Sequence, residues 1–196
     1  DKIERPFVLT IHDLTLIHFK NIRSSWLHKI IYPVKYWVMR FILRCSVLRS
    51  KALIVPSEYV KQDILSHWKK SRFGALKPEK ITVTPEAVED HTGDKKQPRP
   101  MKNNYLLYVG AAYPHKNLEV LAKGYERLRE SNPDLKLVMI GKKDYWKDKL
   151  QRDYESVTFP GYVPNEKLVA YYQHASLFVF PSLSEGFGLP PLEAMA

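Results

Sequence analysis

The sequence predicts an α/β protein built on two parallel sheets, and three observations support that prediction. Segments with the residue pattern of strands alternate with segments that have the spacing of helices. The strand segments are nearly continuous apolar runs, which is typical of parallel strands covered by helices on both faces. A polar stretch over 89–104 interrupts the alternation and predicts a linker between a domain of residues 1–88 and a domain of residues 105–196.

Five elements are expected in the first domain. They are strand 6–11, helix 24–50, strand 51–57, helix 57–68 and strand 80–88. The first helix follows from apolar residues that recur three and four positions apart. Pro33 is expected to kink it or to begin a new helix, and Ser57 is expected to cap the second helix.

The second domain follows the same alternation. Its expected elements are strand 105–111, helix 117–131, strand 135–141, a helix soon after, strand 156–163, helix 164–175, strand 176–182 and a helix opening at 189. In open parallel sheets, ligands bind beyond the carboxyl ends of the strands. Residues of unusual chemistry follow these ends: His12 and Asp13, Gly110 to Lys116, Gly141 to Lys143, Gly161 and Tyr162, and Glu185 to Gly188.

Composition is that of an ordinary globular protein. The chain has 196 residues, of which 44% are hydrophobic and 12% aromatic, and this excludes a disordered chain. The single cysteine, Cys45, excludes an intramolecular disulfide and fits a reducing compartment. The opening residues lack the layout of a signal peptide, and no apolar run reaches the roughly 18 residues of a membrane-spanning helix. We therefore expect a cytoplasmic protein.

The loop "VGAAYPHKN" (109–117) is a candidate anion site. Lys116 lies at or just before the start of a predicted helix, whose unpaired N–H groups favour an anion such as phosphate. The lysine would add a full positive charge. The alternative is an ordinary surface lysine in a turn.

The stretch "SEGFGLPPLEAMA" (184–196) places two carboxylates around two glycines and two prolines. Gly186 and Gly188 allow the backbone to approach a ligand closely, and residues 190–191 suit a first helical turn. Glu185 and Glu193 would accept hydrogen bonds from a hydroxyl-rich ligand such as a sugar. Alternatively, Glu193 complements the helix dipole and Glu185 is a solvated loop charge.

Three segments, "YVGAAYPHKNLEVLAKGYERL", "FPGYVPNEKLVAYYQHASLFVFPS" and "SEGFGLPPLEAMA", resemble the retaining glycosyltransferases of family 4, mannosyltransferases among them. The segments "VLTIHDLTLIHF" and "ALIVPSEYVKQDI" add weaker support. The resemblance implies the GT-B fold, in which two Rossmann-like domains face a cleft. It also implies that strands precede the chain and that about half of the second domain follows it. We therefore expect residues 1–88 to be part of the acceptor-side domain, residues 105–196 to be part of the nucleotide-sugar domain, and the fragment alone to be inactive.

The resemblance assigns roles to individual residues. It implies donor-binding residues Gly110, Lys116, Tyr162, Val163, Glu185, Gly186, Phe187, Gly188, Leu189 and Glu193, and catalytic residues Glu185, His12 and Lys116. Glu185 would face the donor sugar with the N–H groups that follow it, and Glu193 would bind the ribose. Lys116 would hold the diphosphate, Tyr162 and Val163 would meet the base, and His12 would lie near the transferred sugar.

One position departs from the family pattern. Many members carry arginine directly after the glycine equivalent to Gly110, where this chain has Ala111. Either Lys116 then suffices for the diphosphate, or Lys142 or a residue beyond this chain assists it. The resemblance implies no metal and no cofactor, and the sequence contains no convincing cluster of metal ligands.

The basic residues are concentrated in one segment. The formal net charge is +10, and no acidic residue lies between Asp13 and Glu58. At helical spacing, the predicted helix 24–50 would carry a basic stripe beside large apolar residues: Lys29, Arg40, Arg44 and Lys51 beside Trp26, Trp37 and Phe41. This predicts docking to an anionic membrane surface at the cytoplasmic face. The alternative is a core-packing helix with a solvated face.

The expected function is transfer of a hexose from a nucleotide-diphosphate sugar to a hydroxyl of a sugar or lipid-linked acceptor, in the synthesis of a lipid-linked or polysaccharide precursor, with retention of configuration. Mannose from a guanosine donor is suggested by the resemblance. A nucleotide-sugar epimerase of GT-B fold is one alternative. A nucleic-acid-binding protein is another, since basic and aromatic residues gather, but no recognition motif is present and we expect no nucleic-acid partner.

Overall fold

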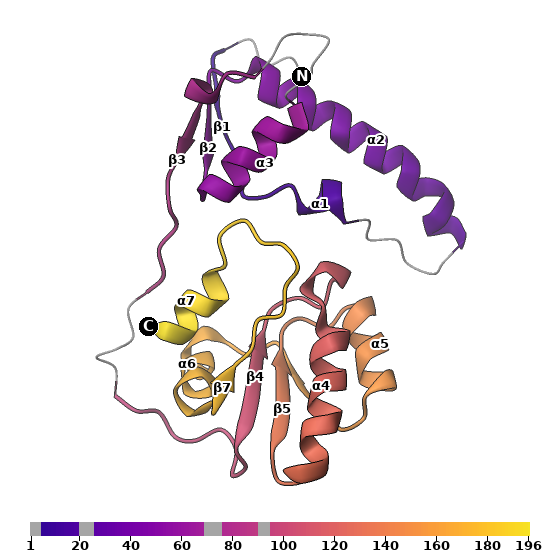
Figure 1. Cartoon of the computed structure of the whole chain (residues 1–196), viewed down its shortest axis with the longest axis vertical. Helices are drawn as coiled ribbons and strands as arrows, with labels where there is room; N and C mark the ends of the chain where they lie inside the picture. The colour runs from indigo at the N-terminus through magenta and orange to yellow at the C-terminus, as the bar shows by residue number, and fades with distance from the viewer. Residues whose placement is uncertain (1–4, 20–25, 69–75, 90–94) are drawn as a thin grey trace. The chain divides into compact units, whose positions relative to one another are not determined.

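The computed structural model describes residues 5–19, 26–68, 76–89 and 95–196, with the backbone alone for 26–30. The chain forms two compact units. Unit 1 comprises Asp1–Glu86 with Glu185–Phe187, and unit 2 comprises Ala87–Ser184 with Gly188–Ala196 (Figure 1). Part of the predicted linker, residues 90–94, lies outside the described residues, and the predicted domain boundaries stay predictions.

Unit 1 contains a three-stranded parallel sheet in the order β1-β2-β3. The strands are β1 (Val8–Thr10), β2 (Ala52–Val55) and β3 (Ile81–Val83), and the helices are α1 (Thr15–His18), α2 (Trp26–Arg49) and α3 (Glu58–Trp68), with a 3-10 turn η1 (Pro78–Lys80). Leu53 and Val55 of the central strand are fully buried against Val47 of α2 and Ile64 of α3. The sheet is therefore covered by the helices that the apolar spacing predicts.

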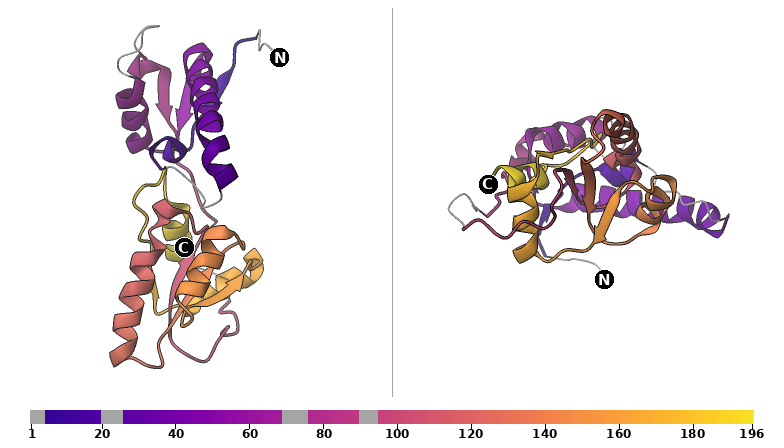
Figure 2. Two further views of the ribbon diagram at one scale, coloured as in Figure 1. Left: turned by 90° about the vertical axis from the view of Figure 1, so that its right-hand side faces the viewer. Right: turned by 90° about the horizontal axis from the view of Figure 1, so that it is seen from below.

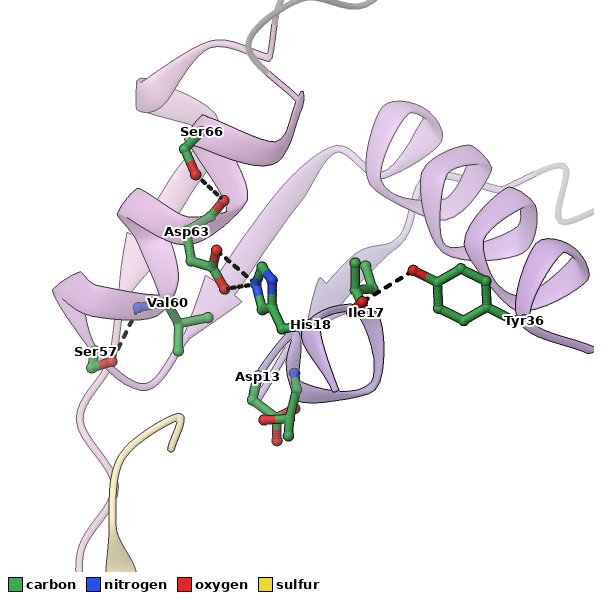
Figure 3. Close-up of polar contacts among 9 residues, drawn as sticks. Asp13, Ile17, His18, Tyr36, Ser57, Val60, Asp63 and Ser66 are labelled. Carbon is green, nitrogen blue, oxygen red and sulfur yellow. Dashed lines mark hydrogen bonds and ion pairs between the residues drawn. The ribbon is translucent and has the colours of Figure 1, made fainter. Parts of the chain in front are cut away.

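The helix ends in unit 1 have identifiable causes. The backbone N–H of Val60 donates to Ser57 Oγ over 3.3 Å at the start of α3, so the predicted cap is confirmed (Figure 3). α2 runs through Pro33 without interruption, so the alternative that Pro33 begins a new helix is wrong. α2 ends at Arg49, because the Lys51 N–H donates to Phe7 O over 2.8 Å on the sheet. Lys51 therefore does not belong to the predicted helical stripe.

Unit 2 contains a four-stranded parallel sheet in the order β6-β5-β4-β7. Its strands are β4 (Tyr105–Val109), β5 (Lys136–Ile140), β6 (Thr158–Gly161) and β7 (Leu177–Phe178), and its helices are α4 (Leu118–Ser131), α5 (Tyr145–Asp153), α6 (Asn165–His174) and α7 (Leu189–Met195), with a 3-10 turn η2 (Pro114–Lys116). Alternate strand residues enter separate cores: Leu137 packs with α4 and α5, and Val138 packs with α6. Both faces are covered, as Figure 2 shows in two further views, and the predicted parallel α/β fold is confirmed.

Several strands are shorter than predicted, and η1, η2 and α1 are not predicted at all. In β6, Pro160 has no N–H to donate, and the pairing with β5 shifts register between Val138 and Ile140. β7 covers two residues where a strand over 176–182 is expected. Among the helices of the described ranges, none is both long and apolar enough to span a bilayer.

Candidate functional site

Three neighbouring strands of unit 2 end in glycine. Gly110, Gly141 and Gly161 follow or close β4, β5 and β6 with φ of 146°, 157° and 85°. A Cβ on Gly141 would lie 2.1 Å from the backbone oxygen of Gly110, so no other residue fits there. No side chain projects from these three positions, and we call this carboxyl edge of the sheet the glycine floor. The space beside Gly141 is filled by the backbone of Gly110, whereas the space beside Gly161 is open.

Lys116 lies where this floor meets the start of α4. It ends the turn η2, and Asn117, in the left-handed region at φ 57°, is the N-cap of α4. The Leu183 N–H donates to His115 O over 2.8 Å, and Asn117 Nδ2 donates to Pro181 O over 3.3 Å. These bonds hold the Lys116 turn beside the segment that leads to Glu185. The predicted position of Lys116 just before a helix is confirmed, and its contact with a diphosphate stays a prediction.

Glu193 projects from the first turns of α7. Gly188, at φ 93°, is the N-cap, and both prolines fall in the first turn as predicted. Tyr172 of α6 donates its hydroxyl to Glu193 Oε2 over 2.7 Å. Burial first, and then the bond to Glu193, raises the pKa of Tyr172, so its hydroxyl stays protonated as a donor. The carboxylate of Glu193 is therefore held in one orientation.

The side chain of Glu193 lines a pocket of about 680 Å³ in unit 2. This volume is in the range of small-molecule sites. The residues lining it include Ala87, Val88, Glu89, Gln97, Asn165, Glu166, Leu168, Val169, Tyr172, Leu189 and Glu193. Tyr172 is not predicted as a site residue from the sequence, because an aromatic residue in an amphipathic helix has the pattern of a core residue. Nothing in the local sequence shows that its hydroxyl reaches a carboxylate 21 positions away.

Tyr162 and Val163 directly follow the glycine that closes β6. Tyr162 is 65% exposed, whereas Val163 packs against the core that contains Ile140. Among the described residues that line the pocket of Glu193, neither is included. Their backbone contact with a base therefore stays a prediction.

His12 follows the carboxyl end of β1 in unit 1. Its Nδ1 lies 2.6 Å from Glu86 Oε1, a partner that the sequence analysis missed. The neighbouring Asp13 accepts a hydrogen bond from the Thr15 N–H over 2.7 Å, which fixes the turn after the strand. The carboxylate of Glu86 therefore orients the imidazole of His12 through Nδ1, one of its two ring nitrogens.

The glycine ribbon, residues 185–188, passes from one unit to the other. Glu185, Gly186 and Phe187 group with unit 1, and Gly188 groups with unit 2, together with Leu189 and Glu193. Half-buried Glu185 forms part of this crossing. The assembly of Glu185, His12 and Glu193 around one ligand stays a prediction.

A buried lysine lies beneath the glycine floor. Lys147 is 3% exposed, and its Nζ donates to Gly141 O over 2.7 Å and lies 5.7 Å from the ring centroid of Phe159. Burial lowers the pKa of Lys147 to about 8, and Asp144 opposes this shift. Lys142, the helper considered from the sequence, is exposed. Within the described part of the chain, no three side chains of histidine, cysteine, aspartate or glutamate gather as a metal site.

Comparison with known proteins gives one family. A profile described as Glycosyl transferases group 1 matches residues 90–196. The O-antigen chain mannosyltransferase RfbU of Salmonella typhimurium is 32% identical over 98% of this chain and 50% of its own length. The chain therefore spans about half the length of this relative.

Solved glycosyltransferase structures share the fold, HepE and WaaG among them. HepE of Anabaena, in complex with UDP and glucose, superposes with a TM-score of 0.68 at 16% identity, over 97% of this chain and 50% of its own. WaaG, a glycosyltransferase involved in lipopolysaccharide biosynthesis, gives a TM-score of 0.68 at 16% identity, over 96% of this chain and 53% of its own. The predicted GT-B fold class is confirmed.

Proposed function

Because the chain belongs to the glycosyl transferases group 1 family, we propose that the complete enzyme transfers a hexose from a nucleotide-diphosphate sugar to an acceptor hydroxyl, with retention of configuration. The observation that carries this proposal is the carboxylate of Glu193, held by Tyr172 at the start of α7 and facing a pocket of about 680 Å³. A fixed carboxylate is suited to accept two hydrogen bonds from the vicinal hydroxyls of a ribose.

The diphosphate would lie over the glycine floor. No side chain projects from Gly110 or Gly141 there, and the N-terminus of α4 with Lys116 supplies positive potential. Leaving of the nucleoside diphosphate develops negative charge, which these fixed donors stabilise. Lys147 adds a buried cation beneath Gly141, and this offsets the absence of an arginine at Ala111.

The transferred sugar would bind at the glycine ribbon, residues 185–188. Glu185 accepts hydrogen bonds from its hydroxyls, and the N–H groups of Gly186, Phe187 and Gly188 donate to them. His12, oriented by Glu86 at 2.6 Å, would lie near the reacting carbon. Glu185→Ala is then expected to lower turnover of the complete enzyme with little change in donor affinity. Front-face attack and a short-lived intermediate are both compatible with these groups.

Mannose and a guanosine donor are our first candidates, because RfbU is named a mannosyltransferase. Tyr162, Val163 and Leu189 would enclose the base and ribose. We propose that no metal or cofactor takes part, since Lys116 and the helix terminus supply the charge that a cation would provide. Turnover that falls when EDTA is added would contradict this part of the proposal.

The acceptor side would lie at a membrane surface. Val34, Trp37 and Phe41 of α2 are 64%, 70% and 69% exposed, so these residues do not pack in the core of unit 1, whereas Val47 of the same helix does. Arg40 and Arg44 supply positive charge, whereas the Lys29 and Trp26 side chains lie outside the described residues. This combination supports docking to anionic lipid at the cytoplasmic face, beside a lipid-linked or polysaccharide acceptor.

Reversal of charge tests this docking. The double variant Arg40→Glu, Arg44→Glu is expected to lose sedimentation with phosphatidylglycerol vesicles, and Lys35→Glu, an exposed position on the same helix, should cost much less. Equal sedimentation of the double variant and the wild type would defeat the membrane proposal.

Nucleotide binding tests the donor site. Titration calorimetry of the 196-residue chain with GDP-mannose, UDP-glucose and the free diphosphates should give binding, with one base preferred. Glu193→Ala is expected to weaken that binding by about 10- to 100-fold, which is roughly 1.4 to 2.8 kcal/mol. Glu130→Ala, an exposed glutamate of α4, is the matched control. Unchanged affinity in Glu193→Ala would contradict the assignment.

A further inference from the structure

A second cavity, in unit 1, gathers cationic groups that the donor site does not use. It has a volume of about 180 Å³ and is lined by residues of α1, α2 and α3: Ile17, Trp37, Arg40, Phe41, Arg44, His67 and Trp68. The four residues from α2 lie at positions i, i+3, i+4 and i+7, so they share one face of the helix. Two guanidinium groups and an imidazole thus lie against three large aromatic rings.

Arg40 is held in position by neutral groups. Its guanidinium carbon lies 5.5 Å from the ring centroid of Tyr36 and 5.9 Å from that of Trp37. Nη1 of Arg40 donates to the Tyr36 hydroxyl over 3.1 Å. That hydroxyl donates to Ile17 O over 3.0 Å, as Figure 3 shows. Among the described side chains, no carboxylate forms an ion pair with Arg40. The charge is therefore oriented but not neutralised.

The carboxylate beside the cavity is already occupied. Asp63 of α3 holds His18 of α1, whose Nε2 lies 2.8 and 2.9 Å from its two oxygens (Figure 3). The ring of His67 packs edge-on against His18 at 6.2 Å and against Trp68 at 4.8 Å. Burial, then Arg40, then His18 lower the pKa of His67, and Asp63 opposes them. Arg40 and His18 therefore act on His67 in the same direction, and Asp63 acts against them.

Exposure separates these arginines from the other basic residues of the helix. Arg40 and Arg44 are half-buried, whereas Lys35 and Arg49 are exposed. The partly desolvated guanidinium of Arg40 loses hydration that an anion restores through paired N–H donors. The cavity has the volume of about six water molecules at roughly 30 Å³ each, enough for one phosphate and a few attached atoms.

We propose that this cavity binds a phosphate group, with Arg40 and Arg44 as forked donors and His67 as a third. The rings of Trp37 and Phe41 would cover the sugar or acyl portion attached to that phosphate. Binding itself is independent of the donor site in unit 2. Its role, recognition of a phosphorylated acceptor, rests on the proposed function.

Histidine resonances of the 196-residue chain give a local test. Inorganic phosphate should raise the pKa of His67, because an anion opposes the field of Arg40, Arg44 and His18 and acts with Asp63. Arg40→Gln and Arg44→Gln should each weaken this response by at least about tenfold. Lys51→Gln removes the same charge from an exposed position outside the cavity and should leave the response unchanged. Thermal melting of each variant shows whether it is folded.

Two further arms identify the source of the phosphate and separate the proposals. Vesicles of phosphatidylcholine with phosphatidic acid, compared with phosphatidylcholine alone, should perturb His67 if a lipid headgroup is the ligand. Free phosphate alone should suffice if the ligand is a soluble ester. Glu193→Ala, expected to lose nucleotide binding, should keep the His67 response. The inference is overturned if His67 of the wild type responds to neither probe. It is also overturned if both arginine variants respond as strongly as the wild type.

Discussion

The two ligand-binding surfaces proposed for this chain differ in the atoms that form them: main chain in unit 2 and side chains in unit 1. In unit 2, the carboxyl edge of the sheet is backbone, because the neighbouring strands β4, β5 and β6 meet Gly110, Gly141 and Gly161 there. In unit 1, the cavity between three helices is made of long side chains, with Arg40 and His67 among them. Ligand binding at the backbone surface depends on how closely main-chain atoms can be approached. Ligand binding at the side-chain surface depends on the charge and burial of the residues that line it.

The difference determines how each surface should respond to mutation. A glycine floor has no side chain to remove, so it fails when a side chain is added. The cationic cavity fails when a side chain is shortened, and the fold should persist, because the cavity-lining face of α2 contributes little to the buried core. Substitutions at the two surfaces therefore test different physical causes.

The largest effect is expected from Gly141→Ala. The added Cβ would lie 2.1 Å from Gly110 O, and relief requires the ends of β4 and β5 to move apart. We expect a loss of about 3 to 5 kcal/mol in the free energy of unfolding of unit 2, measured by urea denaturation, with loss of nucleotide binding. Gly124→Ala is the control: it lies in α4 with nothing within 4 Å of the added carbon, and should stabilise by about 0.5 to 1 kcal/mol. Similar destabilisation in both variants would refute the close-approach explanation.

Lys147 tests the charge beneath the glycine floor. Its pKa of about 8 in the folded chain is below the usual 10.5, so the unfolded chain binds the proton more tightly. Stability from this group is therefore lowest below pH 8 and rises as pH increases from 8 to 10.5. Between pH 7 and 9.5, the free energy of unfolding of the wild type should rise by about 2 kcal/mol relative to Lys147→Met.

The control for this pH series is Lys149→Met, which removes a half-exposed lysine from the same helix. The pH dependence of its free energy of unfolding should parallel that of the wild type from pH 7 to 9.5, because the pKa of Lys149 is raised by its bond to Glu119. Parallel pH profiles for wild type and Lys147→Met would show that burial does not perturb this lysine.

Tyr172→Phe should give the smallest effect, since it removes one hydroxyl from the pocket of Glu193. The carboxylate keeps its place but loses a donor at 2.7 Å, and with it a defined orientation. Nucleotide affinity is expected to fall about five- to tenfold by calorimetry, or roughly 1 to 1.4 kcal/mol. Tyr171→Phe is the matched control on the same helix. A Tyr172→Phe variant with wild-type affinity would show that the hydroxyl does not position Glu193.

Much of unit 2 could be predicted from sequence because its signals are local. A buried parallel strand is visible in the sequence as an apolar run. A glycine at the end of that run indicates a position with positive φ, or one where another part of the backbone comes too close for a side chain. The start of α7 after Gly188 could also be predicted locally, from the two prolines in its first turn. The shortening of β6 could not be predicted, because the register of β6 depends on its pairing with β5.

The contacts that complete the sites could not be predicted, because each joins residues distant in sequence. Glu86 meets His12 across 74 positions, and Tyr172 meets Glu193 across 21. Arg40 and Arg44 were expected to form a stripe with Lys51, but α2 ends before that residue. Helical spacing predicts which residues share a face, yet it does not indicate what lies opposite that face.

Amide resonances of the glycine floor provide the most direct test of the central claim. On addition of a nucleoside diphosphate to the 15N-labelled chain, the largest shifts should fall on Gly110, Gly141, Gly161 and Gly188, with weaker changes near Tyr172. Strong shifts that map to α2 or α3 of unit 1, with these glycine signals unmoved, would contradict a nucleotide site on the carboxyl edge of the unit 2 sheet.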